Sequence, residues 1–173
     1  ALMTDMSEGE VRSKLLQVLD RYPNVSGINN HMGSQFTQNN RLMATVMNVL
    51  DERGLFYLDS RTSPASVALD EAQKIGVPVL KNQVFLDNER SETAIQRQLE
   101  KLVRIAREEG QSIGIGHFQS METARVLRRK IPEYREKGIQ FVGLSKLFES
   151  FPVQDRVEER PGESYDRSDE SRL

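Results

Sequence analysis

The chain of 173 residues contains no cysteine, which excludes disulfide bonds, thiolate nucleophiles and cysteine-based zinc sites. A metal ion bound by this chain would therefore be held by His, Asp, Glu or Asn side chains. No apolar run approaches the roughly 18 residues that a membrane-spanning helix needs, and no signal peptide is visible. The first residue is Ala1 rather than Met, which is typical of a processed or truncated chain.

The chain also has a small net charge and no recognisable phosphate-binding motif. With 24 basic and 26 acidic residues, the formal net charge is −2, which gives no electrostatic case for binding nucleic acid or an anionic membrane. Gly114 and Gly116 stand close together, but neither G-x-G-x-x-G nor G-x-x-x-x-G-K-[ST] occurs. The G-x-S-x-G turn of many hydrolases is missing too. An unrelated hydrolase-like or phosphate-binding domain is therefore the weakest interpretation.

The apolar residues that are present fall into short strands and amphipathic helices that alternate along the chain. The strands are continuous apolar runs, which is typical of parallel strands buried on both faces. We therefore predict an α/β fold in which helices cover a parallel sheet. The predicted strands are residues 25–29, 55–59, 77–80, 84–88, 112–117 and 139–144.

Local signals mark several helix ends. Ser7 and Glu10 have the spacing of a capping box, which predicts the start of the first helix. Ser63 and Pro64 predict another helix start, because proline is favoured in the first helical turn. Pro132 falls inside the last long helical pattern and is expected to kink or divide that helix.

A change of composition near residue 150 divides the chain. Residues 151–173 contain few apolar side chains and many charges of both signs. Such a segment cannot bury enough surface to offset the entropy of ordering it, so we predict a charged, disordered tail. Residues 1–150 are enough for one domain with a hydrophobic core.

Polar side chains gather at the carboxyl ends of four predicted strands. Ligands bind at these ends in parallel α/β folds, so we expect the side chains to share one rim. Both histidines of the chain fall there, as do two aspartates that directly follow apolar runs. In chain order, the residues are Asn29, Asn30, His31, Asp59, Ser60, Arg61, Asp87, Asn88 and His117.

The two histidines and the two aspartates also have a purely structural interpretation. His31 can bond backbone carbonyls in a turn, and His117 can cap the next helix. Asp59 can cap a turn or pair with Arg61, and Asp87 can form an Asx-turn. The functional interpretation is that imidazole and carboxylate groups bind a divalent ion or move a proton. Such a set suits metal-assisted hydrolysis, in which the ion polarises a carbonyl and lowers the pKa of its water.

Four sequence blocks resemble one known family. They are "GINNHMGSQFT" at 27–37, "GLFYLDSRTSP" at 54–64, "GVPVLKNQVFLDN" at 76–88 and "IGIGH" at 113–117. In order and spacing they are similar to the divergent polysaccharide deacetylases of bacteria, over about residues 1–148. That family is related to the NodB-type carbohydrate esterases. The resemblance implies a (β/α) barrel, a divalent metal that is usually zinc, and a periplasmic or otherwise extracytoplasmic location.

The resemblance also implies that part of the domain is missing from this chain. Family members carry an earlier strand that ends in paired aspartates and a later one with a His-Leu-Pro-type motif, and neither occurs here. In the related esterases these segments supply metal ligands and the catalytic base. Residues 1–150 are therefore expected to form the C-terminal two-thirds of the domain, as a partial (β/α) barrel.

Individual roles follow from the same resemblance. It implies that His31 binds the metal, that His117 acts as the general acid, and that Asp59 is also catalytic. Substrate-binding or positioning roles are expected for Asn29, Asn30, Ser34, Arg61, Asp87 and Asn88. The implied reaction removes acetyl groups from N-acetylated polysaccharide or a peptidoglycan-type glycan. The alternative is a non-catalytic glycan-binding or cell-envelope scaffold protein.

Overall fold

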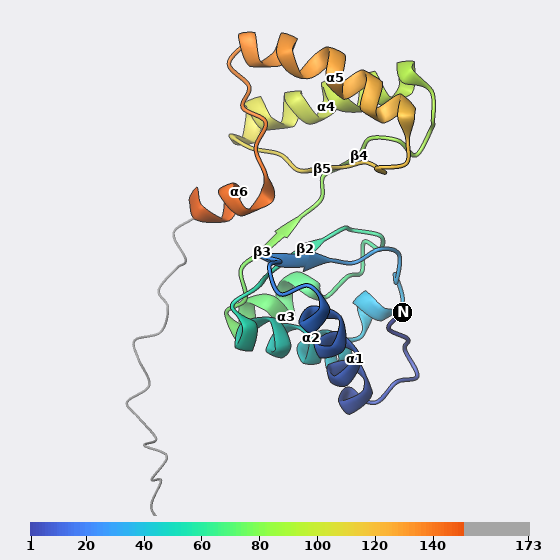
Figure 1. The fold of residues 1–173 in the computed structure, drawn as a ribbon, viewed down its shortest axis with the longest axis vertical. Helices are drawn as coiled ribbons and strands as arrows, with labels where there is room; N and C mark the ends of the chain where they lie inside the picture. Colours follow the sequence, from blue (N-terminus) through green and yellow to red (C-terminus); the bar gives the residue numbers. More distant parts are fainter. Residues whose placement is uncertain (151–173) are drawn as a thin grey trace, which may run out of the picture.

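The computed structural model describes residues 1–150, which form two lobes that follow one another along the chain (Figure 1). Each lobe contains short parallel strands with helices packed against them. The tail predicted for residues 151–173 lies outside the described residues. Within the part of the chain that is described, no helix is long and apolar enough to cross a membrane.

The first lobe is a three-stranded parallel sheet covered by three helices. The strands pair in the order β1-β2-β3. In Figure 1 the helices lie on one side of this sheet. The elements are α1 (Glu8–Arg21), β1 (Gly27–Asn29), the 3-10 helix η1 (Phe36–Gln38), α2 (Asn40–Arg53), β2 (Phe56–Asp59), α3 (Ala68–Ile75) and β3 (Val79–Lys81).

The second lobe is built from two parallel strands and two long helices. Strand β4 pairs with β5, and α4 and α5 pack side by side against them (Figure 1). A short last helix, α6, lies beside the junction of the lobes. The elements are β4 (Val84–Phe85), α4 (Glu92–Glu109), β5 (Gly114–Ile115), α5 (Met121–Glu136) and α6 (Leu144–Ser150).

The two sheets are joined because one stretch of chain serves both. Asn82 donates its backbone N–H to Asp59 O at 2.8 Å, which continues the pairing of β3 with β2. Gln83 then donates its backbone N–H to Ile113 O at 3.0 Å, which begins the pairing with β5. The strand order is β1-β2-β3 in the first sheet and β4-β5 in the second. Every strand pair is parallel, and a helix separates each successive pair of strands except β3 and β4, so the α/β prediction is confirmed.

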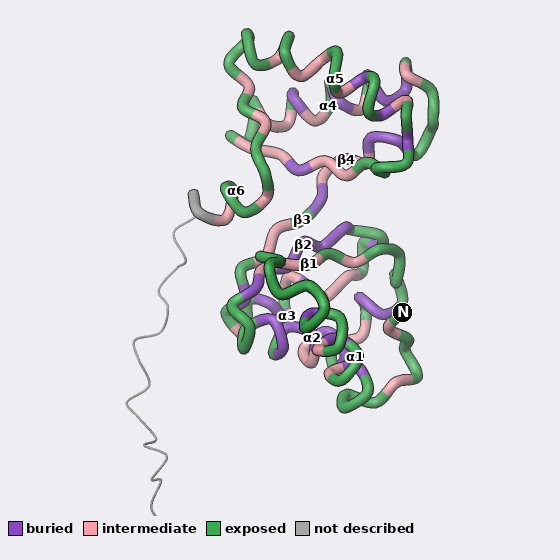
Figure 2. The backbone as a smooth tube through the Cα atoms, viewed as in Figure 1, coloured by how far each residue is buried: buried purple, intermediate pink, exposed green. Residues whose placement is uncertain are grey.

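Two hydrophobic clusters hold the lobes together internally, and Figure 2 shows them as buried segments of tube. In the first lobe α2 is the central element, since its side chains Leu42, Met47 and Leu50 are fully buried. In the second lobe the cluster centres on Ile95 and Leu99 of α4, which are also fully buried. Burial of a side chain of this size contributes about 1.5–3 kcal/mol relative to exposure.

Helix α6 connects the lobes through a ring contact. Phe148 of α6 stacks on Phe56 of β2, with ring centroids 4.1 Å apart and planes inclined by 20°. The Phe56 ring also lies against Gly27 of β1, where a Cβ would overlap the ring. Glycine is therefore needed at position 27 because an aromatic ring occupies the space of its side chain.

Four predictions about helices and strands can be judged. The capping box is confirmed, since Ser7 Oγ accepts from Glu10 N and Glu10 Oε2 accepts from Ser7 N. The strand predicted at 139–144 is wrong: residues 139–143 form no strand and α6 begins at Leu144. The helix start predicted at Ser63-Pro64 is also wrong, because these residues form a turn and α3 begins at Ala68. Helix α5 is not divided, as it continues through Pro132.

Candidate functional site

The two histidines of the chain meet at the carboxyl end of the sheet. His31 follows β1 and His117 follows β5, and their ring centroids are 6.1 Å apart with planes at 90°. Strand β1 belongs to the three-stranded sheet and β5 to the two-stranded sheet. The fold thus brings together two imidazoles that are far apart in the sequence.

His117 is held by the carboxylate of Asp87. The Asp87 side chain is buried, while half of the His117 side chain is exposed. Asp87 Oδ1 lies 2.9 Å from His117 Nδ1, and Asp87 Oδ2 accepts the backbone N–H of the same histidine at 2.7 Å. One carboxylate therefore fixes both the ring and the backbone of His117.

This pairing also fixes where the proton on the ring resides. Burial raises the pKa of Asp87, but hydrogen bonds from His117 and Thr123 outweigh burial, so the pKa lies below its ordinary value. Asp87 is therefore a carboxylate at neutral pH and can only accept hydrogen bonds. Nδ1 of His117 must carry the hydrogen that it shares with Asp87. Nε2 is the ring nitrogen left to exchange a proton with a ligand.

The start of α5 supports the same carboxylate. Ser120 caps this helix by accepting from Thr123 N at 3.1 Å. Thr123 Oγ1 then donates to Asp87 Oδ2 at 2.8 Å. A Cβ at Gly116 would lie 3.0 Å from Thr123 Cγ2 and 3.6 Å from Asp87 Oδ2. The missing side chain at Gly116 therefore leaves room for this network.

A second network ties the loop after β1 to the loop after β2. Asn30 Oδ1 accepts from Ser60 N at 2.9 Å and from the Tyr57 hydroxyl at 3.1 Å, while Asn30 Nδ2 donates to Met32 O. Burial raises the pKa of Tyr57, with the charge of Asp59 adding to the effect, so the phenol keeps its proton and donates. Asn30 thus sets the position of the loop that carries His31.

Asp59 is completely buried at the end of β2. Its Oδ1 accepts the backbone N–H of Arg61 at 2.8 Å, which is the turn-capping interpretation of this residue. The turn holds Arg61 at φ 55°, a left-handed conformation that is uncommon for a residue with a side chain. Asp59 Oδ2 and the buried Asn82 Oδ1 have no hydrogen-bond partner among the described residues. An unpaired buried oxygen is costly, so both atoms indicate a missing donor or water.

The remaining predicted residues lie at the surface of the rim. Asn29 Nδ2 donates to Ser60 Oγ at 3.1 Å, and the backbone oxygen of Ser34 accepts from Gln38 Nε2 at 2.8 Å. Asn88 and the Arg61 side chain are exposed. These contacts position loops, and no contact tests the substrate-binding roles predicted for these residues.

The described residues do not by themselves form a zinc site. A catalytic zinc ion takes three protein ligands, and within residues 1–150 no group of three or more His, Asp or Glu side chains is placed to hold a metal. His31 and the unpaired oxygen of Asp59 are suitable donors by chemistry.

Several residues of the site were not singled out from the sequence. Thr123 supports Asp87, Tyr57 supports Asn30, and Asn82 carries an unpaired buried oxygen. Thr123 stands three residues after Ser120, a residue type favoured at helix starts, which is the one sequence signal available for it. Nothing in the sequence distinguishes Tyr57 and Asn82 from ordinary strand residues.

Comparison with known proteins places this fold and rim in one family. A family profile described as divergent polysaccharide deacetylase matches residues 1–148. The chain belongs to the divergent polysaccharide deacetylase family. The resemblance inferred from the four sequence blocks is thereby confirmed.

The relatives that this chain matches are longer than the chain itself. It is 38% identical over 130 residues to the uncharacterized protein YibQ of Escherichia coli K12, and 36% identical over 151 residues to an uncharacterized protein of Haemophilus influenzae Rd. These matches cover 75% and 86% of this chain but only 40% and 52% of the relatives. The chain thus spans about half the length of the curated relatives it matches, or less.

A solved structure has the same fold. The crystal structure of the uncharacterized protein ATU2773 from Agrobacterium tumefaciens C58 superposes with a TM-score of 0.71 at 32% sequence identity. The match covers 79% of this chain and 56% of that one. The alternation of parallel strands and helices is consistent with a partial β/α barrel.

Proposed function

We propose that this chain forms part of an extracytoplasmic hydrolase domain that removes acetyl groups from an N-acetylated polysaccharide. The family supports the substrate class. The observation that carries the proposal is the buried Asp87 carboxylate, which orients the half-exposed His117 ring toward a second histidine at the same rim. A neutral binding surface has no need of a buried carboxylate behind an imidazole, whereas a proton-transfer site does.

His117 has a defined part in this reaction. Hydrolysis of an acetamido group adds water across the C–N bond and yields acetate and a free amine. The departing nitrogen must gain a proton as the bond breaks. In the proposal Nε2–H of His117 donates that proton, while Asp87 stabilises the imidazolium before transfer and keeps the ring oriented. Positioned acid–base groups of this kind contribute about 10²- to 10⁴-fold in rate.

The proposal includes a divalent metal ion, with zinc as the first candidate. Such an ion would polarise the acetyl carbonyl and lower the pKa of the attacking water. His31 would be one ligand, and others would come from segments outside the described residues. Residues 1–150 are accordingly proposed to be the C-terminal part of a longer domain. Asp59 is proposed to act through its unpaired Oδ2, which can accept a hydrogen bond from such a segment.

The other predicted residues divide into two groups under this proposal. Exposed side chains on the rim are proposed to contact the sugar directly, and these are Ser34, Arg61 and Asn88. Residues whose polar atoms are bonded within the protein are proposed to position the loops and His117, and these are Asn29, Asn30 and Asp87.

A second candidate is a glycan-binding or cell-envelope scaffold protein without catalysis. The incomplete metal shell within the described residues favours it. The two candidates differ in one measurable respect. Binding by a scaffold protein would survive a chelator and the change His117→Ala, whereas hydrolysis would not.

Acetate release tests the proposal. The chain and a version carrying an N-terminal extension from the E. coli relative are incubated with chitooligosaccharides and with peptidoglycan, with zinc or with a chelator. The expected result is zinc-dependent acetate release by the extended protein. If zinc binds tightly and no glycan is deacetylated, the hydrolase proposal fails and the glycan-binding candidate gains support.

A further inference from the structure

The most exposed apolar side chains of the described residues stand close to the two histidines in the sequence. Phe118 is 91% exposed, Met32 is 71% exposed and Met121 is 63% exposed, which are the three highest values among large hydrophobic side chains in this part of the chain. Phe118 directly follows His117, and Met32 directly follows His31. We define Met32, Phe118 and Met121 as the apolar rim. Exposed apolar groups concentrated beside polar ones mark binding sites.

The backbone beneath these side chains is fixed. Met32 has φ 59°, and its carbonyl accepts from Asn30 Nδ2 at 3.1 Å and from Thr62 Oγ1 at 3.3 Å. The loop with Phe118 is closed by Ser120 N, which donates to His117 O at 3.0 Å. A strained, hydrogen-bonded backbone that presents an apolar side chain to solvent costs stability and is typical of a functional loop. The apolar rim is therefore built into the loops rather than left over from folding.

The loops that carry the rim contain no formal charges. Residues 22–40 and 110–121 lack Asp, Glu, Lys and Arg, although the whole chain contains 50 of them (24 basic plus 26 acidic). A phosphorylated or nucleic-acid ligand would need basic side chains at these positions. A membrane surface would likewise call for basic groups beside the apolar ones. The rim instead matches an uncharged ligand that combines an apolar face with polar edges.

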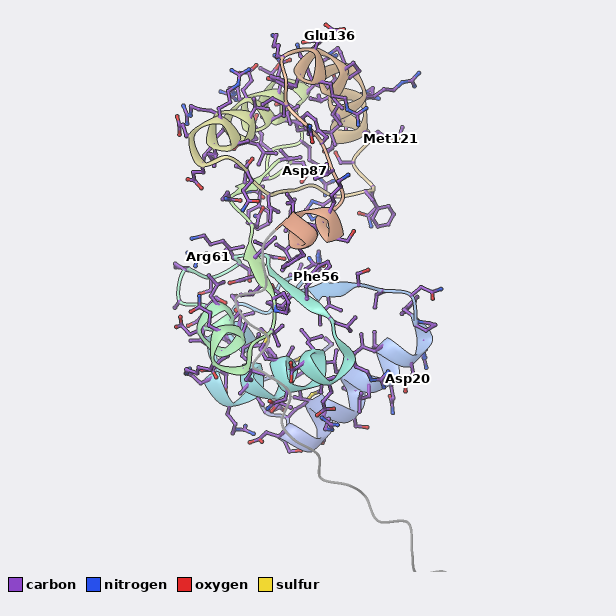
Figure 3. The ribbon with its side chains drawn as sticks, turned by 90° about the vertical axis from the view of Figure 1, so that its left-hand side faces the viewer. Asp20, Phe56, Arg61, Asp87, Met121 and Glu136 are labelled. Atoms are coloured by element: carbon purple, nitrogen blue, oxygen red, sulfur yellow. The ribbon has the colours of Figure 1, made fainter. Side chains whose placement is uncertain are left out.

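We propose that the apolar rim binds one pyranose ring of an uncharged N-acetylated glycan, with Phe118 stacked on the carbon–hydrogen face of the sugar. This inference rests on the proposed function and adds the residue that recognises the sugar chain. Hydroxyl groups at the edge of the ring would face the two imidazoles and Ser34, while Met32 and Met121 would extend the apolar surface beside Phe118. Figure 3 shows Met121 at the outer side of the second lobe, with Asp87 set further inward.

The chain allows a direct optical test because it contains no tryptophan. The variant Phe118→Trp places a single reporter on the rim, and Tyr22→Trp places a matched reporter at the end of α1, where the native side chain is 62% exposed. Both are titrated with chitooligosaccharides of increasing length. We expect a saturable change in the emission of Phe118→Trp and none for Tyr22→Trp. We also expect Phe118→Ala to weaken binding by about tenfold or more, measured by calorimetry.

The outcomes separate this inference from the proposed function. A saturable signal without acetate release supports the rim and counts against hydrolysis. Acetate release with an unchanged KM in Phe118→Ala, and no signal from Phe118→Trp, overturns the rim and leaves hydrolysis standing. No saturable signal with any oligosaccharide also overturns the rim. So does a signal that follows protein concentration instead of sugar concentration, because the rim would then contact a second copy of the chain.

Discussion

Asp87 and His117 are joined at two points, one on the ring and one on the backbone. The carboxylate accepts from Nδ1 at 2.9 Å and from the backbone N–H at 2.7 Å, and Thr123 adds a third hydrogen bond at 2.8 Å. The two residues come from different strand ends, so β4 sets the orientation of a ring that follows β5. A substitution at Asp87 should therefore alter the chemistry of His117, although His117 itself is unchanged.

The change Asp87→Asn should reduce both stability and activity. The amide nitrogen of asparagine cannot accept a hydrogen bond, so it would face one or more of the donors that now bond to the Asp87 carboxylate. A buried polar group would then be unpaired, at a cost of about 1–3 kcal/mol. The orientation of His117 would no longer be fixed, and we expect at least about a tenfold fall in acetate release. Urea unfolding and the acetate assay measure the two effects.

The matched control for this change is Thr123→Val. It removes one hydrogen bond to Asp87 but leaves both bonds between Asp87 and His117. We expect a loss of stability of about 1 kcal/mol and a smaller fall in activity than for Asp87→Asn. Equal loss of activity in the two variants would argue against a special role for the Asp87–His117 contact.

The stability provided by Asp87 should depend on pH in one direction. Hydrogen bonds from His117 and Thr123 outweigh burial and hold the pKa of Asp87 below its ordinary value. An unfolded Asp titrates at about 3.9. The unfolded chain therefore binds more protons in this range, so the contribution is fully present above pH 3.9 or so and disappears as pH falls through the folded-state pKa.

The measurement is the difference in unfolding free energy between the wild-type chain and Asp87→Asn. It should be largest at neutral pH and should shrink when urea unfolding is repeated at about pH 2.5. Other carboxylates titrate in both proteins, so their effects cancel in the difference. A difference that stays constant across this range would show that the Asp87 carboxylate is not stabilised by its partners.

Much of the fold and rim could be predicted because the signals are local. The hydrogen bonds of the Ser7 capping box form within one helical turn. The position at which a strand ends is predicted from the residue at which an apolar run stops. The same rule predicts that His31 and His117 share one rim, and their ring centroids do lie 6.1 Å apart. The Asp87–Thr123 bond could not be predicted, because it depends on how α5 packs across the strand ends.

The wrong predictions share a physical cause. An apolar run such as 139–144 becomes a strand only when a neighbouring strand pairs with it, and residues 139–143 have no such partner in the described part of the chain. Ser63 and Pro64 have the residue types of a helix start, but the hydroxyl of Ser63 accepts from Ala65 N in a turn instead. Tertiary pairing and turn chemistry outweighed local preference in both cases.

The change Gly27→Ala should destabilise the first lobe. Its Cβ would overlap the Phe56 ring, which also stacks on Phe148. Overpacking of this kind costs about 1–3 kcal/mol. In the Phe56→Ala background the same change at position 27 should cost much less, because the ring is gone. Urea unfolding of the two single variants and the double variant measures this coupling.

Gly9→Ala is the control for the same chemical change. Gly9 lies in α1, and nothing stands within 4 Å of a Cβ at this position. We expect a gain in stability of up to about 1 kcal/mol, because alanine favours the helix. If Gly27→Ala were as harmless as Gly9→Ala, the contact of Phe56 with β1 would be contradicted.

His31→Ala should weaken metal binding in the extended protein. The proposal makes His31 a ligand, so its loss should raise the dissociation constant for zinc by at least about tenfold. Competition with a chelating dye measures the affinity. Asn88→Ala, an exposed rim residue without an expected ligand role, should leave it unchanged. Equal zinc affinity in wild type and His31→Ala would remove His31 from the metal shell.

The most direct measurement is acetate release from a chitooligosaccharide by the extended protein and its variants His117→Ala and His117→Gln, with zinc present. If His117, oriented by Asp87, delivers the proton to the departing nitrogen, both variants should lose at least about a hundredfold in rate while sugar binding persists. Undiminished release by either variant would contradict the assigned role of His117, and no release by the parent protein would contradict hydrolysis itself.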